Sequence, residues 1–136
     1  MQNDVIKWIP NGKIQHGSYE LKYINDDFDS LRICIANNEQ EIIIHWDGIV
    51  ESYRRSTEEA RFTFVSEEWQ KIQNTFPNWA FFIMKQSNYR SAFYADYGEF
   101  AEPDEFTHYM IVTENCIIDI VSSFEPDVSV IEANPQ

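Results

Sequence analysis

Glycine, cysteine and long apolar runs are scarce in this chain of 136 residues. The four glycines are widely scattered, which excludes a glycine-rich phosphate-binding loop. Two cysteines, Cys34 and Cys116, are too few for a disulfide-stapled secreted scaffold. Each lies in an apolar stretch, which favours reduced core thiols and leaves a disulfide open. Apolar runs such as Trp79 to Met84 are far shorter than the roughly 20 residues that span a bilayer.

Basic residues are also few, and they are unevenly placed. There are 10 Lys and Arg against 23 Asp and Glu, a formal net charge of −13. Such a charge repels nucleic-acid phosphates and anionic membranes and attracts basic proteins. Ten acidic residues follow Arg90, and no Lys or Arg does. We therefore predict an anionic C-terminal third, a basic protein partner, and neither nucleic acid nor membrane as a partner.

Most of the chain has the alternating apolar pattern of half-buried strands. In the first of them, Tyr19, Leu21 and Tyr23 are expected on one face, with Glu20, Lys22 and Ile24 on the other. Polar turn residues then predict a hairpin to the next strand. The expected strands are 19–24, 31–36, 42–46, 79–85, 106–112, 116–122 and an edge strand at 128–131, after an irregular or short-strand segment at 1–18. Residues 49–53 form either a further short strand or a bent continuation of the strand at 42–46.

Two helices are expected between these strands. The first runs from about Ser66 to Thr75, with acidic residues in its first turn. Ser87 caps the second, in which Tyr89, Phe93 and Tyr97 recur every fourth residue. Strands mixed with two helices predict an α+β fold, a single largely antiparallel sheet with two helices packed on it. A parallel pair across a helix stays possible, and no linker divides residues 1–136, so one domain is predicted.

Metal and nucleophile chemistry finds little support in the pattern. None of the histidines His16, His45 and His108 has another potential ligand at a spacing that is familiar from zinc sites. The turn with Asp26, Asp27 and Asp29 lacks the glycine and the later Glu of a calcium-binding EF-hand loop, so a solvated turn is the favoured interpretation. Nothing marks Cys34 as an activated nucleophile. No metal or cofactor is predicted.

The best enzymatic alternative is a metal-dependent nuclease that uses Glu20 and Lys22. An acid and a lysine two residues apart on a strand share a face and could place a metal beside an ammonium group. This spacing is common on polar strand faces, and the net charge of the chain repels the substrate. An ion pair on the strand surface is the favoured interpretation, and we predict that the protein is not an enzyme.

One segment combines acidic and aromatic residues without any basic ones. Carboxylates pair with Lys and Arg, and exposed aromatic rings supply contact area at low entropic cost. The alternative is a merely solvated loop. The predicted partner-binding residues are Tyr94, Asp96, Tyr97, Glu99, Phe100, Glu102, Asp104 and Glu105, with Phe106 closing the segment and Glu125 and Asp127 as the next acids to examine.

Three stretches resemble a known family: YELKYINDDFDSLRICI, HWDGIVESY and DIVSSFEPDVSVI. They are similar to small acidic immunity proteins that are encoded beside bacterial polymorphic and contact-dependent growth-inhibition toxins. The resemblance implies a protein that neutralises a cognate toxin, without specifying the toxin. It implies no catalytic motif. The mechanism we predict is that an acidic surface binds the cationic toxin domain, often a nuclease, and covers its active site. The N-terminal sequence has neither the cationic start nor the apolar run of a signal peptide, so we expect a cytoplasmic protein. The competing hypotheses are the Glu20 and Lys22 nuclease and a generic acidic protein-interaction module.

Overall fold

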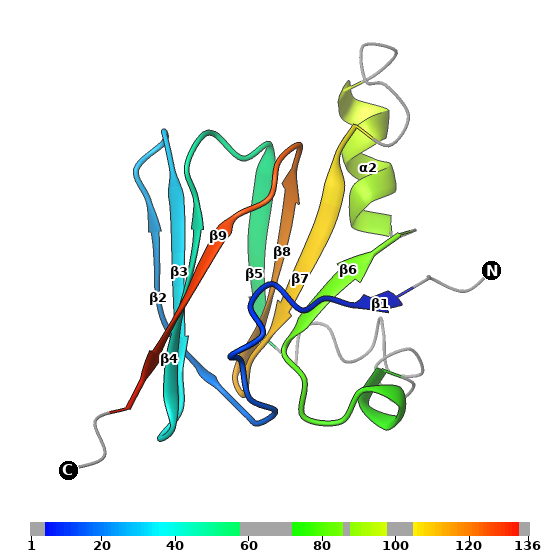
Figure 1. Ribbon diagram of the computed structural model, residues 1–136. Helices are drawn as coiled ribbons and strands as arrows, with labels where there is room; N and C mark the ends of the chain where they lie inside the picture. Colours follow the sequence, from blue (N-terminus) through cyan, green and yellow to red (C-terminus); the bar gives the residue numbers. More distant parts are fainter. Residues whose placement is uncertain (1–4, 58–71, 86–87, 98–104, 134–136) are drawn as a thin grey trace.

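A computed structural model of the chain describes residues 5–57, 72–85, 88–97 and 105–133 (Figure 1). In these ranges it has nine strands and one helix of seven or more residues. They are β1 (Val5–Lys7), β2 (Glu20–Asp26), β3 (Leu31–Ala36), β4 (Gln40–Trp46), β5 (Ser52–Thr57), β6 (Phe81–Met84), α2 (Asn88–Tyr97), β7 (Thr107–Val112), β8 (Cys116–Ser122) and β9 (Asp127–Glu132).

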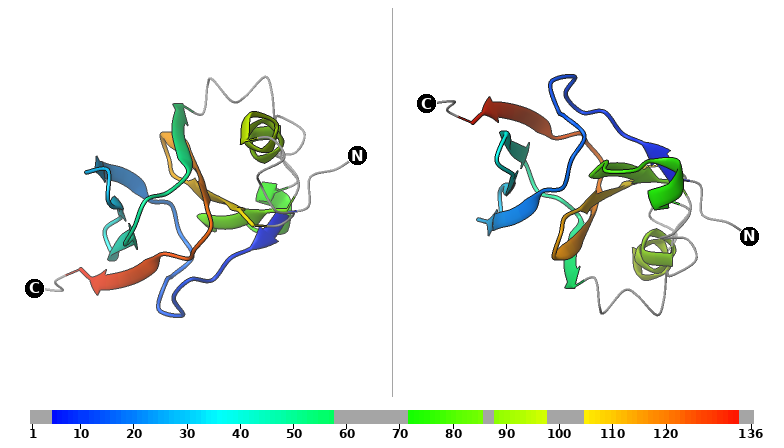
Figure 2. Two further views of the ribbon diagram at one scale, coloured as in Figure 1. Left: turned by 90° about the horizontal axis from the view of Figure 1, so that it is seen from above. Right: turned by 90° about the horizontal axis from the view of Figure 1, so that it is seen from below.

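The strands form two antiparallel sheets that face each other (Figures 1 and 2). The five-stranded sheet has the order β1-β6-β7-β8-β5, and the four-stranded sheet has the order β2-β3-β4-β9. Helix α2 lies on the face of the five-stranded sheet that is turned away from the four-stranded sheet. The fold is therefore mostly β, with two stacked sheets.

The predicted fold class, an α+β domain with one sheet and two packed helices, is wrong. Alternation along a strand shows which residues are buried, but it does not show which strands share hydrogen bonds. Leu31, Ile33 and Ile35 face inward from β3, as predicted, yet they face a second sheet rather than helices. The expected helix at 66–75 is helical over its described part, residues 72–75, and the rest of it lies outside the described ranges.

The space between the sheets is filled by large apolar side chains. Ile33, Ile44 and Trp46 from the four-stranded sheet are fully buried, as are Ile111 and Ile118 from the five-stranded sheet. Each such side chain contributes about 1.5–3 kcal/mol when it is removed from water. The Trp46 ring meets the Tyr109 ring at 5.5 Å between centroids, so the two sheets are in direct contact.

Two local predictions about the strands also need correction. A β-bulge between Leu21 and Tyr23 breaks the expected alternation. Leu21 and Ile24 pack against the core, while Tyr23 is 42% exposed. The strand expected at 49–53 begins later, at Ser52, because the chain leaves the four-stranded sheet after Trp46 and crosses to pair with β8. All pairs are antiparallel, and β9 is an edge strand as predicted.

Segment 8–19 closes one open edge between the sheets. The Asn11 side chain donates to the Val128 carbonyl, and the Trp79 indole donates to the Trp8 carbonyl. Gln40, which is 1% exposed, accepts from the Tyr19 hydroxyl and donates to the Lys13 carbonyl. Buried polar groups with satisfied hydrogen bonds fix this connection firmly against both sheets.

Candidate functional site

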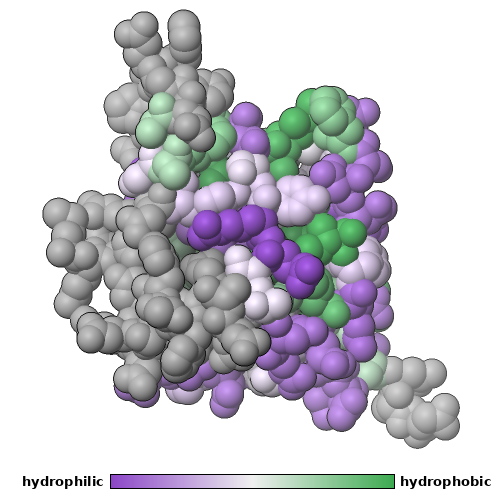
Figure 3. All heavy atoms as spheres, turned by 180° about the vertical axis from the view of Figure 1, so that it is seen from behind, coloured by the Kyte–Doolittle hydropathy of each residue, from purple (hydrophilic) through white to green (hydrophobic). Residues whose placement is uncertain are grey.

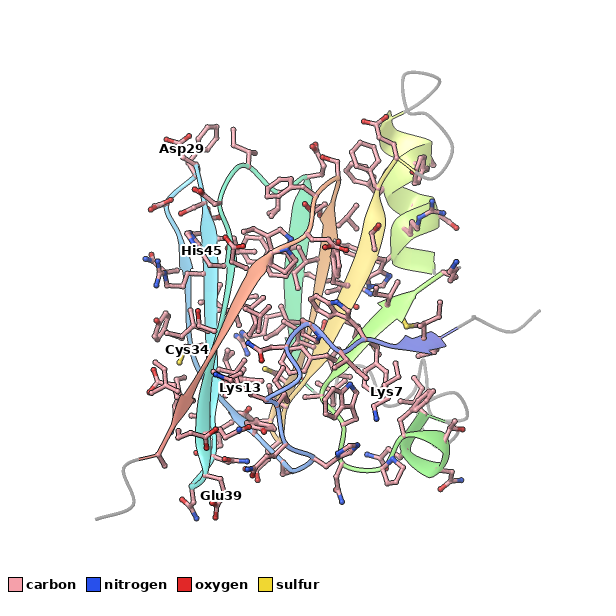
Figure 4. All side chains as sticks on the ribbon, viewed as in Figure 1. Lys7, Lys13, Asp29, Cys34, Glu39 and His45 are labelled. Atoms are coloured by element: carbon pink, nitrogen blue, oxygen red, sulfur yellow. The ribbon has the colours of Figure 1, made fainter. Side chains whose placement is uncertain are left out.

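Three connections meet at one end of the sandwich. The register pairs Leu31 with Trp46 and His45 with Asp127, so the β2–β3 turn, the β4–β5 connection and the β8–β9 turn all leave the four-stranded sheet at the same end. Asp29 marks this end in Figure 4, and Glu39 marks the opposite end. We call residues 26–30, 47–51 and 123–127 the acidic turn end.

Every charged residue of the acidic turn end is acidic. All of these side chains are exposed, and none forms an ion pair with the part of the chain that the structure describes. The nearest basic residues in sequence, Arg32 and Arg54, lie on strands, and Arg54 is bonded to Asp119. The acids are Asp26, Asp27, Asp29, Asp47, Glu51, Glu125 and Asp127.

The β2–β3 turn holds an aromatic ring in solvent. Asp26 Oδ1 accepts from the Phe28 amide at 2.9 Å, and Asp27 Oδ1 accepts from the amide and hydroxyl of Ser30. Phe28 has a φ of +76°, which is unfavourable for a residue with a side chain, and it is 75% exposed. A strained backbone that presents a bare aromatic ring is typical of binding sites.

The β4–β5 connection adds a second exposed apolar side chain. Ile49 is 52% exposed, and Figure 3 shows apolar atoms at the surface of this end beside hydrophilic ones. Gly48 has a φ of +153°, and a Cβ there would lie 2.9 Å from Cζ of Phe124, so the β8–β9 turn packs directly on this connection. The second and third connections therefore form one continuous surface.

A cleft of about 300 Å³ lies between the first two connections. Tyr53 stands at its side, and its hydroxyl donates to Asp26 Oδ2 at 3.1 Å. Burial raises the pKa of Tyr53, and the neighbouring Asp26 carboxylate raises it further. The hydroxyl therefore stays protonated and fixes the position of the Asp26 carboxylate.

The partner-binding segment predicted from the sequence begins at this same end. Helix α2 ends at Tyr97, and β7 begins at Thr107, which pairs with Ser122 beside the β8–β9 turn. Residues 98–104, and with them Glu99, Phe100, Glu102 and Asp104, lie outside the described residues, as do the side chains of Asp96 and Tyr97. Their role in binding stays a prediction.

Tyr94 has a structural role that the sequence did not indicate. Its hydroxyl accepts from the Phe106 amide at 3.0 Å, and the Arg90 guanidinium lies 4.6 Å from the centre of its ring. Its ring is also 5.6 Å from that of Phe106. The half-buried Tyr94 thus fastens α2 to the start of β7, whereas Glu105 is exposed.

A second polar cluster lies between α2 and the five-stranded sheet. Asp119 is fully buried, and it accepts from His108 Nε2 at 2.6 Å and from Arg54 Nε at 3.0 Å. The Tyr89 ring packs on Arg54 and on His108, and its hydroxyl lies 2.5 Å from Ser52 Oγ. Since His108 is only 1% exposed, we interpret the cluster as a structural anchor for α2.

The other residues considered for chemistry remain dispersed. Glu20 and Lys22 form an exposed ion pair at 3.3 Å on the surface of β2, as favoured from the sequence. Cys34 and Cys116 are both buried and free. No group of three or more metal-binding side chains occurs among the residues that the structure describes.

Two features escaped the sequence-based prediction. The Asp-Asp-Phe-Asp run at 26–29 was interpreted as a solvated turn, although an aromatic residue between acids was the available signal for a binding surface. The contact between His108 and Asp119 joins neighbouring strands diagonally, and no spacing along the chain predicts it.

Comparison with protein-family models, with curated proteins and with solved structures finds no match for this chain. Among the described residues, no helix has both the length and the apolar character needed to cross a membrane.

Proposed function

We propose that this protein is an immunity protein that binds a cationic toxin domain through the acidic turn end and neutralises it by covering its active site. One observation carries the proposal: seven exposed acids without an ion-pair partner among the described residues lie at the same end of the sandwich as the exposed apolar side chains Phe28 and Ile49. Carboxylates attract and orient a basic partner, and apolar anchors hold it. Such a toxin acts in the cytoplasm, so the proposal places this protein in the cytoplasm as well.

The resemblance to the immunity family agrees with the location of this surface. The three stretches that carry the resemblance span residues 19–35, 45–53 and 119–131. Each stretch contains one of the three connections that form the acidic turn end. The same residues therefore support the proposal in two ways, by their similarity and by their arrangement.

The predicted segment from Tyr94 to Glu105 stays a second candidate for partner contacts in this proposal. The strand that follows it, β7, begins at Thr107, which pairs with Ser122 beside the β8–β9 turn. Inhibition needs no chemistry from this protein, because a bound domain over the active site excludes the substrate.

The proposal expects a large toxin gene beside this one, and the absence of such a gene would weaken it. The test purifies the C-terminal domain of that expected product, called the adjacent toxin domain, and measures its binding by calorimetry and by stopped-flow association. Two variants each remove five negative charges, so their net charges are equal. The turn-end variant carries Asp29→Asn, Asp47→Asn, Glu51→Gln, Glu125→Gln and Asp127→Asn, and the opposite-end variant carries Glu20→Gln, Glu39→Gln, Glu41→Gln, Glu114→Gln and Glu132→Gln.

The turn-end variant should bind on the order of 10-fold more weakly or worse, mainly through slower association, because rim charges steer the encounter. The opposite-end variant should change affinity by less than about 3-fold. The strands hold the two ends roughly 20 Å apart, well beyond the screening length of about 8 Å in physiological salt. Equal effects of the two variants, or a toxin domain that does not bind at all, would contradict the proposal.

A further inference from the structure

The cleft between the β2–β3 turn and the β4–β5 connection has walls of two kinds. Phe28, Leu31, Ile49 and the Tyr53 ring make it apolar, while Asp26 and Glu51 place carboxylates on it. None of the described residues that line it is a Lys or an Arg. At about 300 Å³ it lies at the small end of ligand pockets, which run from about 300 to 1,000 Å³. It is the size for one long side chain rather than for a folded segment.

The combination of walls fits a side chain that is apolar along its stem and cationic at its tip. Arginine and lysine bury their methylene groups against apolar surface and keep the charged head near polar groups. Asp26 is already fixed, since one oxygen accepts from the Phe28 amide and the other from the Tyr53 hydroxyl. Each carboxylate oxygen has a second acceptor site, so Asp26 can still bind a cation.

Two features favour arginine over lysine. A guanidinium is planar and stacks on an aromatic face, and the exposed Phe28 ring offers such a face. A guanidinium also has five donors in one plane and can bond to two carboxylates together, whereas an ammonium is a compact and strongly hydrated charge.

We propose that this cleft is a receptor for a single arginine side chain of the partner protein. The inference rests on the proposed function, because it names the chemical group that the acidic turn end recognises. Phe28 stacks on the guanidinium, Asp26 and Glu51 accept its hydrogen bonds, and Ile49 with Leu31 contacts its methylene groups. The remaining acids of the surface act as a field that attracts the basic partner.

The test titrates the isotope-labelled protein with Nα-acetyl-arginine amide and follows backbone amide shifts by NMR. Saturable shifts are expected at Phe28, Ile49, Glu51 and Tyr53, with a dissociation constant on the order of 1 mM, as is usual for a ligand of this size. The neutral isostere Nα-acetyl-citrulline amide should bind at least about 10-fold more weakly, and Nα-acetyl-lysine amide about 5-fold more weakly.

Matched variants locate the effect. Glu51→Gln should weaken arginine amide at least about 5-fold, and Phe28→Leu should do the same by removing the stacking face. Glu39→Gln removes an equal charge from the exposed turn at the opposite end of the sandwich and should leave the dissociation constant within about 2-fold. Thermal melts check that each variant is folded.

The inference is wrong if arginine amide gives no saturable shift at about 100 mM, a concentration far above the expected dissociation constant. It is also wrong if citrulline or lysine amide binds as tightly as arginine amide, or if Glu51→Gln leaves the dissociation constant of arginine amide unchanged. None of these touches the proposed function, which depends on the toxin domain and the two five-charge variants. Conversely, a toxin domain that ignores the turn-end variant refutes the function even if arginine amide binds.

Discussion

Replacing Phe28 by glycine should make the protein more stable and less able to bind. Phe28 has a φ of +76°, where a residue with a Cβ costs on the order of 1–2 kcal/mol more than glycine. Its side chain is 75% exposed, so little buried apolar area is lost with the ring. The larger freedom of glycine in the unfolded chain offsets part of the gain. We expect a net stabilisation of about 1 kcal/mol.

Binding should respond in the opposite direction. If the ring is buried against the partner, its loss should cost on the order of 2 kcal/mol, or about 30-fold in affinity, with a faster off-rate. Urea unfolding measures the stability, and calorimetry with the adjacent toxin domain measures the affinity. The control Phe28→Leu keeps the backbone strain and an apolar side chain, so its stability should stay near that of the wild type.

The two halves of this prediction can fail separately. A loss of more than about 1 kcal/mol in Phe28→Gly, within the range usual for packed residues, would show that the ring supports the fold. Unchanged affinity in a stable Phe28→Gly protein would show that the ring is not an anchor. Either result refutes the view that strain at Phe28 serves binding.

Three further predictions concern the rest of the fold. Asp119→Ala removes the fully buried acceptor of His108 and Arg54, so it should lower the free energy of unfolding in urea by about 3–5 kcal/mol. The exposed Glu114→Ala should change it by less than about 0.5 kcal/mol, and equal effects of the two variants would contradict the anchoring role. In Gly48→Ala the new Cβ would lie 2.9 Å from Phe124, and the backbone φ of +153° is unfavourable for a residue with a side chain, so the free energy of unfolding should fall by about 1–2 kcal/mol. Gly12→Ala has nothing within 4 Å and should be nearly neutral, and similar thermal melts for the two variants would refute this prediction. Burial raises the pKa of the Cys34 thiol to about 11, with Glu41 adding to the effect, so in a Cys116→Ala background the maleimide reaction of Cys34 at pH 8 should be roughly 100-fold slower than that of a free thiol of pKa 9.0. Because the folded-state pKa is the higher one, this group's contribution to stability is complete below pH 9 and is lost as the pH rises from 9 to about 11, and a rate that levels off near pH 9 would contradict the shift.

The strands were predictable because their pattern is local. Leu31, Ile33 and Ile35 are buried in the core, while Arg32 and Ala36 between or beside them are only half-buried, as the pleat of a strand with one face in a core predicts. Cys34 departs from this alternation because it is buried as well. The bulge at Lys22 was not predictable in the same way, since it depends on how β2 must twist against β3. The division into two sheets was missed because hydrogen-bond partners are a property of the whole chain.

One strand did carry a signal of the layered arrangement. Residues 116–122 are buried at every position, including Asp119, because one face of β8 meets the four-stranded sheet and the other meets the layer that contains α2. In the sequence this is a nearly continuous apolar run, which is typical of a strand covered on both faces. That run also predicts that a charged residue within it must be paired, as Asp119 is.

The acidic turn end was only partly predictable. The acids at 26–29, 47–51 and 125–127 are visible in the sequence, and so is the absence of basic residues among them. Their convergence depends on the register of β3, β4 and β9, which brings residues about 100 positions apart to one end. The acids of the segment from Tyr94 to Glu105 lie close together along the chain, so the sequence alone shows their cluster.

Hydrogen exchange of the complex with the adjacent toxin domain tests the central claim most directly. Amides in the turns at 26–30, 47–51 and 123–127 are in exposed connections, so a partner seated there should slow their exchange. The account predicts this protection, together with unchanged exchange in the turns at 37–39 and 113–115 at the opposite end. Protection confined to the opposite end, or to the outer face of the four-stranded sheet, would contradict it.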